Sequence, residues 1–132
     1  MSFLLHRDTC AAYLQQVRRL VNRRVQQQGN LHVSPVTVTD LEMWLVRAAT
    51  PSQYLLRYRL FLQDVSILTV DDAIAHCAAG IGSRLRLQGR NPGLAALLVA
   101  ATALERRLTL VTHAAQTFAG ILGLMMQDWT VP

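Results

Sequence analysis

Residues Leu97 to Trp129 read LLVAATALERRLTLVTHAAQTFAGILGLMMQDW, and this stretch decides the fold class of the chain. Its first part places apolar residues at helical spacing, which predicts a helix from Leu97 that ends before Leu108. Leu108 to Thr112 is too short for a helix and apolar enough for a buried strand. A short helix and a last strand ending at Asp128 and Trp129 follow. A strand that is apolar throughout is typical of a parallel sheet covered on both faces.

The rest of the chain alternates in the same way between strands and helices. We expect strands at Ser2–Leu5, Leu31–Val33 and Val65–Val70, and helices at Thr9–Gln28, Pro35–Ala49, Pro51–Leu62 and Asp71–Arg90. Such alternation predicts an α/β/α domain with three layers around a mainly parallel sheet of about five strands. With 132 residues, the chain has the length of one domain, residues 1–132.

Composition narrows the classes of partner. All 13 basic residues are arginine, and the formal net charge is +5. Arginine forms bidentate hydrogen bonds with phosphates and carboxylates, so the balance favours RNA or an acidic peptide, with a merely solvated basic surface as the alternative. No run approaches the roughly 20 apolar residues of a membrane span. Residues 1–5 show no export signal, so we expect a cytoplasmic protein that does not insert in membranes.

The sequence resembles the PIN domains, small Mg²⁺-dependent nucleases that include the VapC-type toxins of bacterial toxin–antitoxin pairs. Leu97–Leu104 matches the apolar helix of that family, and Thr109–Thr112 matches its T-L-V-T strand. Phe118, Gly123-Leu124 and Trp129 match the family's phenylalanine and closing strand. The resemblance extends from Phe3 to Trp129 and implies the PIN-like fold.

The family's acidic residues are mostly missing. The resemblance puts His6, Ala96 and Thr117 at three positions where the family has carboxylates, and Asp40 at the fourth, where the family has glutamate. Mg²⁺ prefers near-octahedral oxygen ligands, usually with more than one carboxylate or phosphate. We therefore expect a catalytically inactive or impaired PIN-domain protein that keeps a binding role, either for an antitoxin or for RNA.

A rearranged site is the alternative. Asp8 follows the first predicted strand, at the sheet edge where α/β proteins bind ligands. If Asp8 turned toward Asp40, with His6 as a nitrogen ligand, the chain could be an active endoribonuclease that uses Mg²⁺ or, better, Mn²⁺ or another transition metal. In the family, the residue at the Asp8 position supports the site without holding its metal. Glu42 lies about 200° around the helix from Asp40 and cannot join it.

Two further expectations concern partners. A set of arginines on the helices either side of the Gly93 loop could converge beside the family's active site and contact RNA phosphates: Arg84, Arg86, Arg90, Arg106 and Arg107. No aromatic residue alternates with these arginines, so base stacking is not indicated. The resemblance also implies a homodimer, and the helices around Tyr13–Val25 and Tyr54–Leu62 could serve as an interface to a second copy or to an antitoxin helix, or in a purely scaffolding role.

Overall fold

The computed structural model describes residues 1–47 and 52–132. Its centre is a five-stranded sheet with the strand order β3-β2-β1-β4-β5, and every neighbouring pair is parallel. The strands are β1 (Phe3–Leu5), β2 (Leu31–Val33), β3 (Ser66–Ile67), β4 (Thr109–Val111) and β5 (Met126–Gln127). The predicted fold class is confirmed: this is a PIN-like α/β/α arrangement.

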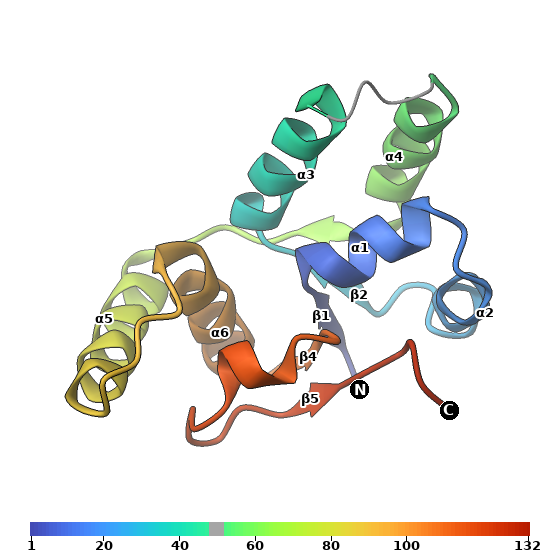
Figure 1. Ribbon diagram of the computed structural model, residues 1–132. Helices are drawn as coiled ribbons and strands as arrows, with labels where there is room; N and C mark the ends of the chain where they lie inside the picture. The colour runs from blue at the N-terminus through green and yellow to red at the C-terminus, as the bar shows by residue number, and fades with distance from the viewer. Residues whose placement is uncertain (48–51) are drawn as a thin grey trace.

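Helices cover both faces of the sheet (Figure 1). One layer contains α1 (Arg7–Leu14), α2 (Arg18–Gln26), α3 (Pro35–Arg47) and α4 (Ser52–Asp64). The other contains α5 (Asp72–Leu87) and α6 (Leu94–Arg106), with a short 3₁₀ turn, η1 (Ala115–Phe118), after β4. The predicted helix end at Ala49 and helix start at Pro51 lie outside the described residues.

The alternation of side chains along the strands divides the core into two parts. Phe3 and Leu5 of β1 pack with the α1–α4 layer, whereas Leu4 between them packs with α5 and α6. Val111 and Leu110 of β4 divide in the same way. Successive residues of a strand point to opposite faces, so a strand that is apolar at every position is required in the middle of this sheet.

The first predicted helix is divided in the structure. The chain forms α1 and α2 instead of one helix over Thr9–Gln28, and α1 begins at Arg7, with His6 at its N-cap position. Gln16 between them has φ = 66°, a left-handed conformation that ends the first helix. The apolar spacing continues across the break, so periodicity alone did not reveal it.

The caps of α3 and α5 were predicted correctly, whereas the third strand is shorter than predicted. Ser34 Oγ accepts a hydrogen bond from Val36 N at 3.1 Å before Pro35, and Asp71 caps α5 by accepting from Ile74 N at 3.0 Å. The strand predicted at Val65–Val70 is only Ser66–Ile67, with both residues exposed. It lies at the edge of the sheet, where only one side pairs. In the described residues, no helix is both long and apolar enough to cross a membrane.

Candidate active-site region

The carboxyl ends of β1 and β4 lie side by side at the centre of the sheet. Leu5 pairs with Val111 in register, and His6 N donates a hydrogen bond to Val111 O at 3.0 Å. The chain leaves β1 toward β2 on one side, while β4 pairs on the other side of β1. This is the switch point of the sheet, where ligands bind in open α/β folds. Residues that follow β1 and β4 therefore form the candidate site.

Asp8 is the centre of a hydrogen-bond network across this switch point. Thr112 Oγ1 donates to Asp8 Oδ2 at 2.7 Å, and the backbone N–H of His113 donates to the same oxygen at 3.2 Å. The backbone N–H of Thr9 donates to Asp8 Oδ1 at 2.6 Å. Asp8 and Thr112 are separated by 104 residues, so this carboxylate joins the end of β1 to the end of β4.

His6 completes the network. Its Nδ1 lies 3.2 Å from Asp8 Oδ1 and 3.3 Å from Thr112 Oγ1, and its ring meets Phe118 edge to face at 5.1 Å. An ionised carboxylate can only accept, so the nitrogen that faces Asp8 carries the proton. The histidine at the family's first carboxylate position is thus a hydrogen-bonded partner of Asp8, and only 8% of it is exposed.

The surroundings of Asp8 favour its ionised form. Partial burial raises the pKa of the carboxyl group, but hydrogen bonds from His6 and Thr112, together with the charges of His6 and His113, outweigh burial and lower the pKa below its ordinary value of 3.8. The carboxylate is therefore charged at neutral pH, and its oxygens are already occupied by donors within the protein. A metal ion would have to replace these donors.

Asp40 lies on α3, and its partner is an arginine. Arg7 Nη1 is 3.7 Å from Asp40 Oδ2. Glu42 points elsewhere, because its Oε2 accepts a hydrogen bond from the Tyr58 hydroxyl at 2.7 Å across to α4. The prediction that Asp40 and Glu42 do not converge is confirmed.

The last two family positions carry no metal ligand. Ala96 is 8% exposed and belongs to the apolar core between the sheet and α5–α6. Thr117 lies in η1, and its backbone oxygen, at 3.5 Å, is one of several η1 carbonyls that face the Arg90 guanidinium. Arg90 also donates to Gln116 O at 3.2 Å and to Ala119 O. An arginine therefore holds the segment in which the family carries its fourth acid.

The donor set does not fit Mg²⁺. Asp8 is held by His6, Thr112 and backbone amides, and Asp40 is paired with Arg7. Among residues 1–47 and 52–132, no group of three or more His, Cys, Asp or Glu side chains is arranged to hold a metal ion. Hard divalent cations need several free oxygen ligands, which this arrangement does not offer.

The predicted convergence of five arginines is wrong. Arg84 and Arg86 lie in the last turn of α5, whereas Arg106 forms an ion pair with Asp71 at 3.2 Å, at the start of α5. Thirteen residues of helix separate Asp71 from Arg84, which is roughly 20 Å along the axis. Arg107 is the C-cap residue of α6, next to Arg106 and therefore far from Arg84 and Arg86. The five residues thus occupy two separate places, and their binding of RNA stays a prediction.

Sequence reasoning missed Thr112 and His113 as members of the network. Thr112 directly follows β4, the strand beside β1, and its position at the carboxyl end of a buried strand could have indicated its role. It also missed that Arg7 lines one pocket with Asp40 and Trp44, two residues that share a face of the predicted helix. No local pattern links Arg7 to residues on α3.

Known proteins similar to this chain were found by sequence and by structure. No family model matches the sequence. The chain is 27% identical over 131 residues to the tRNA(fMet)-specific endonuclease VapC of Shigella flexneri, covering 98% of this chain and 99% of that protein. The VapBC-1 structure from nontypeable Haemophilus influenzae has a TM-score of 0.84 and 25% identity, with 99% and 100% coverage. DNA-bound VapBC from Salmonella typhimurium has a TM-score of 0.89 and 22% identity, with 98% coverage of both chains.

The strand order and the two helical layers define a PIN-type α/β fold. Similarity over nearly the full length of a VapC endonuclease narrows the class further. Over nearly its whole length the chain is thus similar to VapC-type PIN-domain proteins, as the resemblance of Phe3–Trp129 indicated.

Proposed function

We propose that this chain is a VapC-type PIN-domain protein whose nuclease chemistry is lost or impaired, and whose retained role is to bind a partner, an antitoxin protein or RNA. The proposal rests above all on the hydrogen-bond network of Asp8. In a rearranged metal site the Asp8 carboxylate would have to bind the cation, but it already accepts hydrogen bonds from His6, Thr112 and two backbone amides. Asp40 faces Arg7 instead.

The chemistry of phosphodiester hydrolysis explains the expected loss. A metal nuclease polarises a phosphoryl oxygen and lowers the pKa of the attacking water through its cation. Where the cation lacks carboxylate ligands, neither effect is available. The residues at the four family positions, His6, Asp40, Ala96 and Thr117, supply one carboxylate among them.

A cleavage assay tests the loss of activity. Purified protein incubated with structured RNA and Mg²⁺ or Mn²⁺ is expected to give no cleavage above a buffer control, because no multi-carboxylate metal site forms. Gel analysis of end-labelled RNA measures this directly. The matched variants Asp40→Ala and Asp8→Asn identify the source of any signal. Metal-dependent cleavage that both variants abolish would establish the alternative, an active endoribonuclease with Asp8 and Asp40 as metal ligands.

The relatives support an antitoxin as the partner. The neighbouring structures from Salmonella typhimurium and Haemophilus influenzae are VapBC assemblies, and a Klebsiella pneumoniae structure with 21% identity and a TM-score of 0.74 is a toxin–antitoxin complex. On this chain, α3 and α4 present an apolar groove of about 340 Å³. Its lining includes Val46, which is 86% exposed, and Leu55, which is 42% exposed. The apolar stripe of an amphipathic helix is complementary to such a groove.

A charge placed in this groove is expected to weaken partner binding. Leu55→Asp should reduce co-purification with a co-expressed candidate antitoxin at least tenfold, because a carboxylate would be buried against apolar side chains. Leu122→Asp is the control, since Leu122 is 77% exposed after η1 and away from the groove. Affinity capture followed by quantitative gel analysis measures both. Equal capture by the two variants would place the partner elsewhere, for example on the surface of a homodimer.

A further inference from the structure

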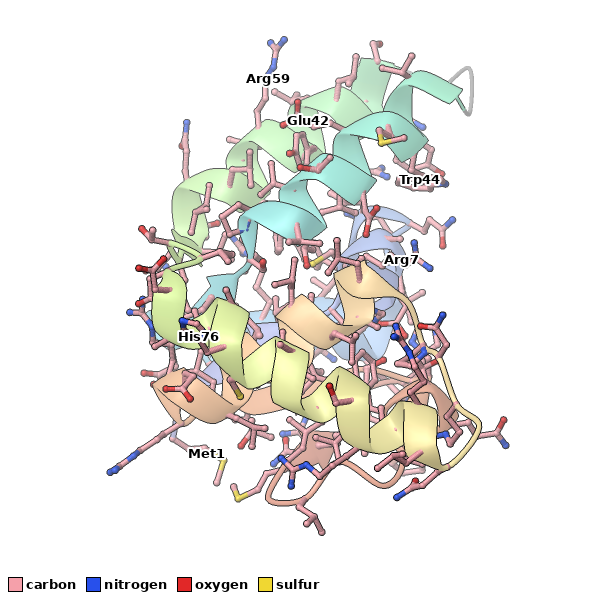
Figure 2. All side chains as sticks on the ribbon, turned by 90° about the vertical axis from the view of Figure 1, so that its left-hand side faces the viewer. Met1, Arg7, Glu42, Trp44, Arg59 and His76 are labelled. Atoms are coloured by element: carbon pink, nitrogen blue, oxygen red, sulfur yellow. The ribbon has the colours of Figure 1, made fainter. Side chains whose placement is uncertain are left out.

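A pocket between α1 and α3 includes Asp40, one of the four family positions, and combines charged and aromatic side chains. It has a volume of about 300 Å³ and is lined by Arg7, Ala11, Asp40, Leu41, Met43 and Trp44. That volume lies at the lower end of the range for small-ligand sites. A cation, a carboxylate and an indole ring thus meet in one concave place. Figure 2 shows Arg7 and Trp44 on the same side of the molecule.

The spacing along α3 places the carboxylate and the indole one above the other. Asp40 and Trp44 are four residues apart in one helix, so they share a face at about 6 Å along the axis. Trp44 is partly exposed, whereas Leu41 below it is 2% exposed. A flat ring that stacked on Trp44 would therefore turn one edge toward the Asp40 carboxylate.

Arg7 provides the opposite wall. It is the first residue of α1, its side chain is 60% exposed, and its contact with Asp40 is long at 3.7 Å. Exposed pairs of this kind hold their partners weakly, so the guanidinium is free to bind a phosphate. Ala11 follows one turn later and, as a small side chain, leaves the space between the helices open.

We propose that this pocket binds one guanine nucleotide of a single-stranded RNA. The base stacks on Trp44, its N1–H and N2–H donate to the two oxygens of Asp40, and its phosphate binds Arg7. Guanine presents two adjacent N–H donors on one edge, which a carboxylate accepts as a pair. Single-stranded RNA is recognised by such stacking and edge contacts. The assignment rests on the RNA-binding part of the proposed function.

Binding can be measured by tryptophan fluorescence, because only one of the two tryptophans of the chain lines the pocket. Trp129 is 3% exposed, packs on Phe3 and donates its indole N–H to Gln127 at 3.0 Å. Nucleotide quenching of tryptophan fluorescence therefore reports on Trp44, and Trp44→Phe serves as the blank. Guanosine 5′-monophosphate is expected to quench saturably. Inosine 5′-monophosphate, which lacks the 2-amino group, should bind roughly tenfold more weakly, as should adenosine 5′-monophosphate.

Variants separate the three contacts. Asp40→Asn should remove the preference for guanosine over inosine monophosphate, because a carboxamide offers only one acceptor oxygen. Arg7→Gln should weaken the monophosphate while leaving guanosine itself unchanged. Arg18→Gln, at an exposed arginine on α2, is the control and should bind as the unmodified chain does. Circular dichroism verifies that each variant is folded.

Several results would overturn the assignment. They are equal quenching by all four ribonucleoside monophosphates, an unchanged guanosine preference in Asp40→Asn, and the absence of saturable binding by the folded chain. These outcomes are distinct from a failure of the proposed function. A chain that binds no nucleotide but captures its antitoxin and cleaves no RNA retains that function, whereas metal-dependent cleavage would refute it while leaving the nucleotide titration valid.

Discussion

Asp8→Ala is expected to lower the free energy of unfolding by about 3 kcal/mol, because it removes one acceptor and leaves several donors, most of them buried or partly buried, without a partner. Those donors are the Thr112 hydroxyl, the His6 ring and the amides of Thr9 and His113. The Asp8 side chain is 17% exposed, so water cannot replace all these contacts. Urea denaturation at pH 7, followed by circular dichroism, measures the change.

The control and the pH dependence make the cause identifiable. Asp40→Ala removes an exposed ion pair and should cost less than about 1 kcal/mol. The folded pKa of Asp8 lies below its ordinary value of 3.8. Its contribution is therefore complete above that value and is lost as the pH falls through the folded pKa. The difference between the unmodified chain and Asp8→Ala should persist at pH 5 and shrink below pH 3.8. Equal losses in Asp8→Ala and Asp40→Ala would contradict this account.

Restoring the family carboxylates is expected to create metal dependence. The combined substitutions are His6→Asp, Ala96→Asp and Thr117→Asp, with Asp40→Glu. They place carboxylates at all four family positions, one of them, at residue 6, in direct contact with Asp8. Without metal, mutual repulsion and burial should lower the free energy of unfolding by about 3 kcal/mol or more at neutral pH. Mn²⁺ or Mg²⁺ should restore much of this loss, because an ion that binds only the native state stabilises it. Thermal unfolding with and without metal measures both changes.

The matched amide variant separates charge from shape. His6→Asn, Ala96→Asn and Thr117→Asn, with Asp40→Gln, have nearly the same volume but no carboxylates to bind a cation. This protein should show no shift in melting temperature with Mn²⁺. If the restored chain is poorly folded at pH 7, the His6→Asp single variant carries the same test. A metal response in the unmodified chain equal to that of the restored chain would show that the native site already binds the ion.

Local patterns in the sequence predicted much of the fold. The apolar run Leu108–Thr112, the cap at Asp71 and Pro35 at the start of α3 each depend on a few neighbouring residues, and the structure has the expected element at each place. The predictions were wrong where an element's bounds depend on contacts outside the local sequence pattern. The break at Gln16 lies within continuous apolar spacing. The length of β3 depends on its place at the sheet edge.

For the candidate site too, some features follow from the sequence alone and others only from the tertiary structure. The sequence by itself determined that His6, Ala96 and Thr117 cannot serve as carboxylate ligands, because chemical identity does not depend on folding. Only the tertiary structure decided what Asp8 does, since its partners Thr112 and His113 lie more than 100 residues away along the chain. The same holds for Arg7, which faces Asp40 and Trp44 only because α1 packs beside α3. Contacts between distant segments follow from the order of strands in the sheet, and no local sequence pattern specifies them.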